Sequence, residues 1–397
     1  MRIAFDHQAF CLQKIGGISR YFCRLAEQLE QTKQADDVGV FAPLYRNQYL
    51  RELSKNLVHG YSVKDYPAKT AGLLVKANGW LAKSQIKEWK PDLVHETYFS
   101  QNGSAPKACP VVLTVFDMIP ELEAIAYQAK PRTTTDQTAE LASAKRVAVQ
   151  RADHIICISE HTRGDLLKLY QVPEKKVSVV YLGCEAANEQ SAAANTTINI
   201  STKQDTSRTR QSRPYLMYVG LREGYKNFEQ LLRAIAQSPA LLAEFEVLAF
   251  GGGALTTAEQ QIISTLGFKP TQVRQQAGDD TALNEAYQNA AAFVYPSAYE
   301  GFGLPPLEAM AKNCPVISSN TSSMPEVIGS AGEYFDPQSL DSISGAIETV
   351  VFSKERTQEL IKLGREQVKL FTWQRCAQET RAIYQAVLNA SLPTRMQ

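Results

Sequence analysis

Residues 291–309, AAFVYPSAYEGFGLPPLEA, decide the fold. Residues 291–295 form a short continuous apolar run, the pattern of a strand buried on both faces. Glycines at 301 and 303 then interrupt the pattern, and Pro305 and Pro306 suit the first turn of a helix, where no donor N–H is needed. A buried strand that leads through a glycine loop into a helix is the repeating unit of a parallel sheet. An α/β fold is therefore predicted.

The same alternation of strands and helices extends in both directions along the chain. Strands are predicted at residues 2–5, 38–41, 93–95, 111–116, 154–159 and 177–181, and again at residues 215–219, 245–250, 291–295 and 316–318. Helices are predicted between them, for example at residues 18–29, 227–236, 305–311 and 343–351. The rhythm predicts parallel sheets that are covered by helices on both faces.

A polar segment divides the chain into two parts. Residues 188–213 are rich in Ser, Thr, Gln, Asn and Ala, too polar to build a core, and are predicted to be a linker or surface loop. Because 397 residues exceed one typical core, we predict an N-terminal domain over 1–187 and a C-terminal domain over 214–371. Ligands of open α/β sheets bind at the carboxyl ends of the strands, so a ligand cleft is expected where these ends face each other.

Composition excludes several classes of protein. Lys and Arg total 42 against 41 Asp and Glu, a balance that argues against a nucleic-acid binder. No uninterrupted apolar stretch has the length of a membrane span, and Asp6 interrupts the short apolar run at the N-terminus. The seven cysteines are scattered without a Cys-x-x-Cys pair, which favours reduced thiols and a cytoplasmic protein and indicates no metal site.

Two glutamates flank the glycine loop. Glu300 stands at its entrance, where a carboxylate can accept hydrogen bonds from hexose hydroxyls, and Glu308 lies about one turn into the helix, where it suits a ribose diol. The helix N-terminus between them offers free N–H groups to a phosphate. Ser297, Gly301, Phe302, Gly303 and Leu304 complete this predicted site. The alternative is a capped helix with two surface glutamates.

A second polar cluster follows the predicted strand 215–219. The sequence GLREGYKN begins with Gly220 and places Arg222 and Lys226 at the carboxyl end of that strand. Fixed cations there can stabilise the negative charge that develops on a leaving nucleoside diphosphate. Such a pair can replace a divalent metal, and the chain has no Asp-x-Asp. A diphosphate site that needs no metal or other cofactor is therefore predicted, against the alternative of an ordinary solvated turn.

With seven residues between them, Glu300 and Glu308 resemble the E-x7-E motif of the retaining GT-B glycosyltransferases of family 4. The resemblance spans nearly the whole chain, since it includes the glycines at 16 and 17, the segments 158–160, 218–220 and 323–327, and the segment 371–373. It implies two Rossmann-like domains and a C-terminal helix, 372–397, that crosses back to the first domain. It also implies that Gly16 and Gly17 approach the donor phosphate and that Asp279 lies near the base of the donor.

The acceptor site departs from the family pattern. Many members carry a His before the Asp that follows the fourth strand, whereas this chain has Phe116 before Asp117. Asp117 remains a candidate to contact the acceptor hydroxyl. His95, at the end of another predicted strand, is a second candidate, although a single His at a strand end is more often structural.

The segment 70–90 combines apolar residues, two tryptophans and several lysines. Such a helix can lie on an anionic membrane surface. It can equally be an ordinary surface helix whose apolar side faces the core. The first alternative places the protein peripherally on the inner face of the plasma membrane.

The resemblance implies transfer of a hexose, of the mannose or rhamnose type, from a GDP-, UDP- or dTDP-sugar to a glycan or lipid-linked glycan in O-antigen or capsule synthesis. A GT-B epimerase, a phosphorylase and an inactive nucleotide-sugar-binding module are the alternatives. No lysine is identified for the pyridoxal phosphate of a phosphorylase, and the intact cluster of Arg222, Lys226, Glu300 and Glu308 argues against inactivity. The sequence leaves open the sugar, the base, the acceptor, the linkage and the oligomeric state.

Overall fold

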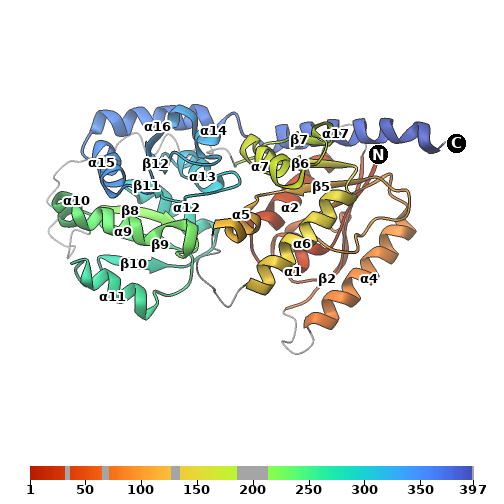
Figure 1. Cartoon of the computed structure of the whole chain (residues 1–397), viewed down its shortest axis with the longest axis horizontal. Coiled ribbons are helices and arrows are strands. Elements are labelled where there is room, and N and C mark those ends of the chain that lie inside the picture. The colour runs from red at the N-terminus through yellow and green to blue at the C-terminus, as the bar shows by residue number, and fades with distance from the viewer. Residues whose placement is uncertain (32–35, 65–70, 127–134, 186–212, 396–397) are drawn as a thin grey trace. The chain divides into compact units, whose positions relative to one another are not determined.

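The computed structural model describes residues 1–31, 36–64, 71–126, 135–185 and 213–395, and Figure 1 traces the chain through them. The chain forms two compact units. The first consists of Met1–Gly183 and Trp373–Gln397, and the second of Cys184–Thr372. Nearly all of the linker predicted at 188–213 lies outside the described residues.

The sheet of the first unit is wholly parallel in its described strands. In spatial order these are β3 (Val58–Ser62), β2 (Asp37–Tyr45), β1 (Arg2–Phe5), β4 (Leu93–Glu96), β5 (Val111–Val115), β6 (His154–Cys157) and β7 (Val177–Val179). Its helices are α1 (Gln8–Leu12), α2 (Gly17–Gln31), α3 (Tyr49–Glu52), α4 (Ala71–Trp89), α5 (Ile119–Ala126), α6 (Thr135–Arg151), α7 (Glu160–Tyr170) and α17 (Trp373–Arg395).

The sheet of the second unit is also parallel throughout its described strands. In spatial order these are β10 (Val273–Gln276), β9 (Glu246–Phe250), β8 (Tyr215–Val219), β11 (Ala292–Tyr295), β12 (Val316–Ser319) and β13 (Gly332–Phe335). Its helices are α9 (Phe228–Gln237), α10 (Pro239–Glu244), α11 (Thr257–Thr265), α12 (Asp280–Asn289), α13 (Leu304–Ala311), α14 (Met324–Ile328), α15 (Leu340–Val351) and α16 (Lys354–Val368). The predicted α/β fold is confirmed.

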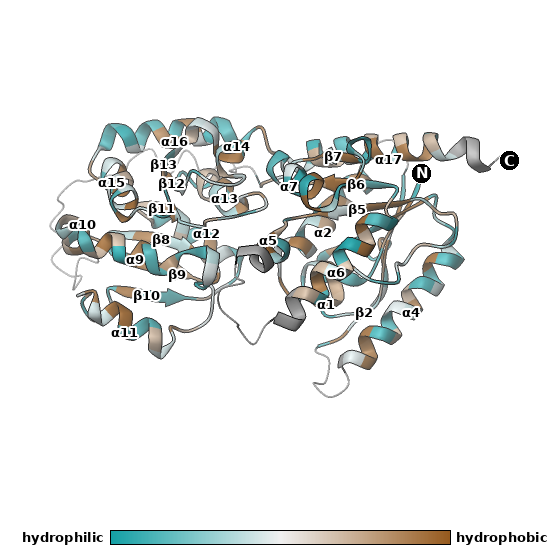
Figure 2. Ribbon diagram, in the orientation of Figure 1, coloured by the Kyte–Doolittle hydropathy of each residue, from teal (hydrophilic) through white to brown (hydrophobic). Residues whose placement is uncertain are grey.

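Burial explains why these segments fold as they do. The central strand β11 is fully buried, and α9 buries Leu231 and Ile235, one helical turn apart, against the core. Figure 2 shows the same division, since helices such as α4 and α9 carry both hydrophilic and hydrophobic residues. Among the described helices, none combines the length and the apolar character needed to cross a membrane.

The last helix, α17, belongs to the first unit although it follows the whole of the second in sequence. It packs against α2. Arg381 binds the buried carboxylate of Asp36 at 2.6 Å, and the Tyr384 hydroxyl lies 2.5 Å from His95 Nδ1. The chain therefore passes from the first unit into the second and returns to the first unit at its C-terminal end.

Candidate functional site

The glycine loop connects β11 to α13 and depends on one unusual backbone conformation. Gly303 caps α13 with φ of 114°, a conformation that other residues rarely adopt. Pro305 occupies the first turn, and Phe302 is buried against Phe371, with ring centroids 5.7 Å apart. The α13 N-terminus is thereby fixed at the carboxyl edge of the sheet, where the N–H groups of Gly303 and Leu304 can meet an anion, since Pro305 and Pro306 have none.

Hydroxyl groups that the sequence analysis missed hold this loop in place. After the neighbouring strand β12, Ser319 donates to the Ser297 carbonyl at 2.6 Å, and Ser323 donates to the carbonyls of Glu300 and Phe302, both at 2.8 Å. Ser322 accepts from the Glu300 amide at 2.9 Å. In the sequence, the run SSNTSS at residues 318–323 could have indicated these contacts, since loops that follow adjacent parallel strands meet at one edge of the sheet.

Lys226 and Glu300 form an ion pair across 74 residues of sequence. Lys226 Nζ lies 2.6 Å from Glu300 Oε1, and their side chains are only 17% and 12% exposed. Lys226 ends the short turn η2 (Gly224–Lys226), and the Tyr225 carbonyl accepts from the Ala298 amide at 2.7 Å. The two predicted clusters therefore meet, because β8 and β11 are neighbours in the sheet.

The pKa of the buried Tyr295 hydroxyl is shifted by its surroundings beside this pair. Burial, together with the charge and hydrogen bond of Glu300, raises the pKa of Tyr295 well above its usual value. Lys226 Nζ lies 5.9 Å from the centroid of the same ring. A positive charge, a negative charge and a neutral phenol thus share a partly dehydrated corner of the second unit.

Arg222 is held by a glycine turn and by a glutamate that sequence analysis missed. Its guanidinium donates to Glu259 Oε1 at 2.6 Å and to the carbonyls of Gly251 and Ala254 at 3.1 and 3.0 Å. The side chain is only 3% exposed. At Gly252, where φ is 69°, an added Cβ would lie 2.6 Å from Arg222 Nη1, so only glycine fits. In the sequence, the glycine triplet 251–253 after β9 could have indicated this turn.

Glu259 has a second task, at the N-terminus of α11. It forms a capping box with Thr256, in which Oε2 accepts from the Thr256 amide at 2.7 Å and from its hydroxyl at 2.9 Å. Burial acts to raise the pKa of Glu259, but the hydrogen bonds from Arg222 and Thr256 outweigh it, and the pKa is lowered. The T-x-x-E spacing of residues 256–259 is typical of a capping box, but it does not indicate the contact of Glu259 with Arg222.

The remaining predicted donor residues lie along the same sheet edge. Glu308 is half-buried in α13, of which Leu304 is the first residue, and Gly301 is buried. The Ser297 hydroxyl is buried and has no hydrogen-bond partner among the described residues. Gly220 has φ of 123° and donates its N–H to the Phe250 carbonyl. Asp279 caps α12 by accepting from the Ala282 amide at 3.0 Å, two strands away from β8.

The glycines at the start of α2 lie in the first unit. The Gly16 carbonyl accepts from the Ser19 hydroxyl and the Arg20 amide, both at 3.0 Å. Gly17 is exposed, and an added Cβ would meet nothing within 4 Å. Local packing therefore gives no reason for a glycine at 17.

Asp117 follows β5 and keeps a third of its side chain exposed. Its Oδ1 accepts from the Ile119 amide at 3.1 Å. The buried Lys145 donates to the Asp117 carbonyl at 3.0 Å and to Glu121 at 2.7 Å, which fixes the backbone beneath it. Phe116, which replaces the family histidine, is buried edge-on against Tyr21 and has no polar atom to offer an acceptor.

The expectation that His95 contacts the acceptor is wrong. The side chain is completely buried, its Nε2 lies 2.8 Å from Thr114 Oγ1 and its Nδ1 contacts Tyr384 of α17. Burial lowers the pKa of His95 to about 3, so the ring is neutral. It joins β4, β5 and α17, and its role is structural.

Within the described residues no group of three or more His, Cys, Asp or Glu side chains is placed to hold a metal ion. The cations at the candidate site are supplied by the protein itself, as Arg222 and Lys226. What this arrangement offers chemically is a helix N-terminus, an ammonium and a guanidinium at one edge of a parallel sheet, with carboxylates beside them.

Comparisons with known proteins assign the family. The model described as Glycosyltransferase Family 4 matches residues 15–187, and the model described as Glycosyl transferases group 1 matches residues 199–367. The chain belongs to glycosyltransferase family 4, and it is a glycosyltransferase with the two-domain GT-B fold.

Individual proteins resemble the chain along nearly its whole length. O-antigen chain mannosyltransferase B of Escherichia coli is 26% identical, over 92% of this chain and 94% of its own. Sucrose-phosphate synthase from Thermosynechococcus elongatus is 19% identical, with a TM-score of 0.73, over 98% of this chain and 99% of its own. Anabaena HepE in complex with UDP-glucose is 17% identical, with a TM-score of 0.66, over 96% and 99%. These two structures establish the fold alone.

The hold of Glu259 on Arg222 can be tested through stability. Glu259→Gln keeps a side chain that can complete the capping box but removes the charge beside a buried guanidinium. We expect the free energy of unfolding in urea to fall by about 2 kcal/mol at pH 7. A folded carboxyl with a lowered pKa contributes stability above its unfolded value of 4.5, and this is lost as the pH falls through the folded value. The difference between variant and wild type should therefore vanish in acid.

Glu246→Gln is the matched control, because Glu246 pairs with Arg274 at 3.4 Å in a more exposed setting. It should cost under about 0.5 kcal/mol. Equal losses for the two variants, or a loss for Glu259→Gln that persists in acid, would contradict the assigned contact.

Proposed function

We propose that this glycosyltransferase moves a mannose- or rhamnose-type hexose from a nucleoside-diphosphate sugar to a glycan or lipid-linked glycan, in the synthesis of O-antigen or capsule, with retention of anomeric configuration. The observation that carries the proposal is the 2.6 Å pair of Lys226 and Glu300 beside the N-terminus of α13. The name of the Escherichia coli relative supports the mannose type and the O-antigen pathway. The UDP-glucose complex of HepE supports a nucleotide-sugar donor.

Several of the predicted residues take part in donor binding. The donor diphosphate is bound by Lys226, by Arg222 and by the N–H groups of Gly303 and Leu304 at the start of α13, all of which favour negative charge. Glu308 accepts from the ribose diol, and Glu300 from hydroxyls of the hexose. Asp279 lies near the base, and Gly16 and Gly17 approach the diphosphate. Because the cations belong to the protein, the transfer needs no divalent metal.

The reaction exchanges two bonds at the anomeric carbon. The bond from that carbon to the diphosphate oxygen breaks, and its electron pair leaves with the diphosphate. The acceptor oxygen then bonds to the same face, and its proton passes to the leaving phosphate oxygen. Lys226 and Arg222 stabilise the charge that grows on the diphosphate more in the transition state than before it. Asp117 positions the acceptor hydroxyl.

Substitution of Lys226 tests the charge mechanism. Lys226→Ala should lower the turnover number by about 100-fold or more, because a preorganised cation at the leaving group is lost. Transfer to a mannan oligosaccharide is followed with GDP-mannose, UDP-glucose and dTDP-rhamnose in the presence of EDTA. Lys269→Ala, an exposed lysine of the same unit, is the control and should keep full turnover.

Near-normal turnover of Lys226→Ala would remove its assigned role. Activity that EDTA abolishes and manganese restores would remove the metal-independent mechanism. Conversion of the donor to a free epimer without any acceptor would identify an epimerase instead.

Nucleotide binding tests the donor site separately from catalysis. UDP, GDP, ADP, dTDP and CMP are added in turn, and thermal unfolding is measured. A nucleotide at 100 times its dissociation constant should add about 2.7 kcal/mol to the native state. Glu308→Ala should lose that response because the ribose diol loses its acceptor. If no nucleotide shifts the wild type, or if Glu308→Ala responds in full, the donor site is misassigned.

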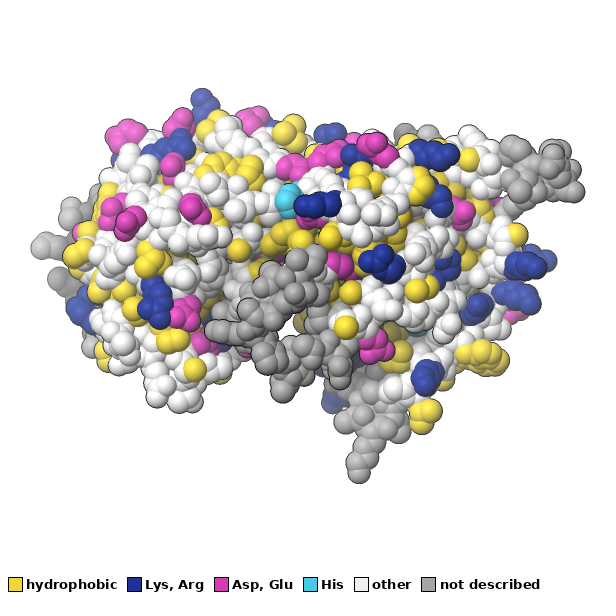
Figure 3. Space-filling view, in the orientation of Figure 1, with side chains coloured by type: hydrophobic (Ala, Val, Ile, Leu, Met, Phe, Trp, Pro, Cys, Tyr) yellow, Lys and Arg dark blue, Asp and Glu magenta, His cyan; other side chains and the backbone are white. Residues whose placement is uncertain are grey.

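Helix α4 is the segment proposed to contact an anionic membrane. One face of the helix packs into the core through Asn78, Ala82 and Ile86, whereas Leu73 and Trp80 on the other face are each 72% exposed. Exposed lysines lie among them, and Figure 3 shows basic and hydrophobic side chains together over this region, at the lower right. Both alternatives predicted for 70–90 thus have support, each on a different face of the helix. Apolar side chains beside lysines are the pattern of an interfacial helix.

Sedimentation with vesicles tests this contact. The wild type should sediment with phosphatidylglycerol vesicles at low salt, and less with phosphatidylcholine. The double variant Leu73→Ser, Trp80→Ser should lose most of this binding. Leu221→Ser, at a 66% exposed leucine of the second unit, is the control and should bind as the wild type does. Unchanged binding of the double variant would rule out α4 as the contact.

A further inference from the structure

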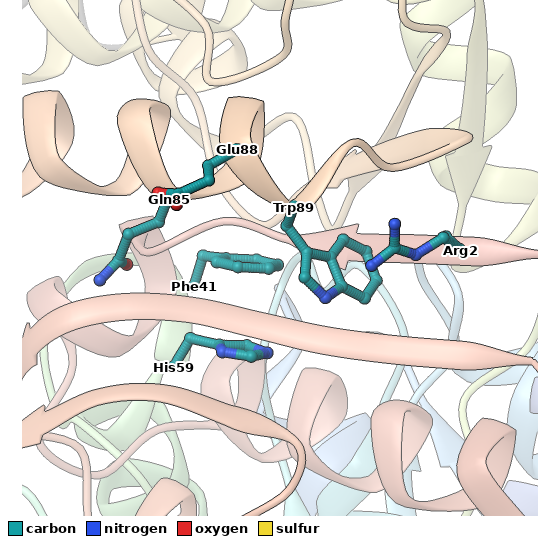
Figure 4. A pocket seen from close by; sticks show the side chains of 6 residues that line it. All are labelled: Arg2, Phe41, His59, Gln85, Glu88 and Trp89. Carbon is teal, nitrogen blue, oxygen red and sulfur yellow. The ribbon is translucent and has the colours of Figure 1, made fainter.

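Aromatic side chains meet at a pocket of the first unit, where their faces are already covered. Figure 4 shows the side chains that line it, which are Arg2, Phe41, His59, Gln85, Glu88 and Trp89. The Phe41 and His59 rings stack with centroids 4.5 Å apart, and the Arg2 guanidinium lies 4.3 Å from the centroid of the Trp89 ring. Because these contacts occupy the ring faces, the cluster packs α4 against the sheet.

A buried tyrosine of the second unit has a different setting, because its hydroxyl contacts the turn that carries both proposed diphosphate-binding cations. Tyr218 is the fourth residue of β8 and is only 1% exposed. Its hydroxyl donates to the carbonyl of Leu221, and the carbonyl of Lys226 is a second acceptor at 3.4 Å. The Leu221 carbonyl belongs to the peptide bond that leads into Arg222. One phenol therefore contacts both ends of the turn 221–226.

The other hydrogen bonds of this turn are local and long. The Lys226 amide donates to the Glu223 carbonyl at 3.3 Å, and the Asn227 amide donates to the Gly224 carbonyl at 3.2 Å. Asn227 has φ of 60°, a left-handed conformation that costs energy for a residue other than glycine. The backbone that carries Lys226 thus gains from a contact that reaches across the turn, which the Tyr218 hydroxyl supplies.

The ring of Tyr218 is held independently of its hydroxyl. It packs against the ring of Phe228, the first residue of α9, with centroids 4.8 Å apart. Burial and the charge of Glu300 raise the pKa of Tyr218 far above its usual value, although Arg222 acts in the opposite sense. The phenol is therefore protonated at neutral pH and available as a donor. Removal of the hydroxyl alone should leave the ring in place.

We propose that Tyr218 is a positioning residue for the donor diphosphate, whose hydroxyl fixes the turn 221–226 so that Arg222 and Lys226 hold their charges in place for the reaction. Because Tyr218 is buried, it acts through the main chain of this turn and not by contact with the substrate. Carboxylates hold the two cations at their side chains, and Tyr218 holds the backbone from which they extend. Charges fixed in advance need no reorganisation as the reaction proceeds. The inference rests on the proposed function, which assigns both cations to the diphosphate.

Tyr218→Phe tests the inference, with Tyr215→Phe as the matched control. Tyr215 lies on the same strand and donates its hydroxyl to the Ala286 carbonyl at 2.6 Å, outside the turn. Each variant loses one hydroxyl that is bonded to a main-chain carbonyl, so both should unfold at a slightly lower temperature than the wild type. Only Tyr218→Phe should lower the turnover number, by about 10-fold. The KM for the acceptor should stay unchanged, because the acceptor does not meet this turn.

Nucleotide binding gives a second measurement that needs no catalysis. Calorimetric titration of the full-length protein compares UDP with UMP, GDP with GMP and dTDP with dTMP. For the base that binds, the wild type and Tyr215→Phe should prefer the diphosphate over the monophosphate by the same ratio. In Tyr218→Phe this ratio should fall about threefold or more, since the second phosphate meets cations that are no longer fixed.

The outcomes separate this inference from the proposed function. Unchanged turnover or an unchanged diphosphate ratio in Tyr218→Phe would overturn the inference and leave the proposed function standing. An equal loss of turnover in Tyr215→Phe would assign the effect to stability, and failure of Tyr218→Phe to fold would make the hydroxyl part of the core, so either result refutes the positioning role. If the wild type binds no diphosphate more tightly than its monophosphate, the proposed function fails at its cations and the inference fails with it.

Discussion

The parallel direction of every described strand pair is the constraint on which the rest of the molecule depends. In such a sheet all carboxyl ends lie at one edge, so loops that are distant in sequence become neighbours. Lys226 follows β8, Glu300 follows β11 and the serines of residues 318–323 follow β12, and these three strands are adjacent. The ion pair between Lys226 and Glu300 and the hydroxyls that fix the glycine loop are consequences of this strand order.

Both cations of the candidate donor site are held by carboxylates. Arg222 is nearly buried against Glu259, and Lys226 contacts Glu300 at 2.6 Å. A carboxylate keeps each long side chain in one conformation. It also offsets the positive charge, and so limits the cost of burying an isolated cation. In Glu259 the same oxygens also cap α11, so helix stability and the placement of Arg222 are coupled.

The first unit places its candidate residues and its exposed apolar residues on different parts of one sheet. Asp117 and the glycines at the start of α2 follow carboxyl ends of strands. Helix α4 packs on the same unit through Ala82 and Ile86, and its Leu73 and Trp80 are exposed. The helix α17 stabilises this unit through Arg381 and Tyr384.

The sequence by itself determined the α/β class, the central strands and the helix after the glycine loop, because buried parallel strands are continuous apolar runs. It missed β3, β10 and β13, which lie at sheet edges and read VHGYS, VRQQ and GEYF, since an edge strand needs less apolar surface. Its donor candidates remain predictions, drawn from charged residues and glycines that directly follow strands. Tertiary structure alone decided which partners these residues meet. Glu259 reaches Arg222 only because β8 and β9 are paired, and His95 is structural because α17 returns from the far end of the chain to cover it. Such contacts are set by strand order and by long-range packing, which local sequence patterns do not encode.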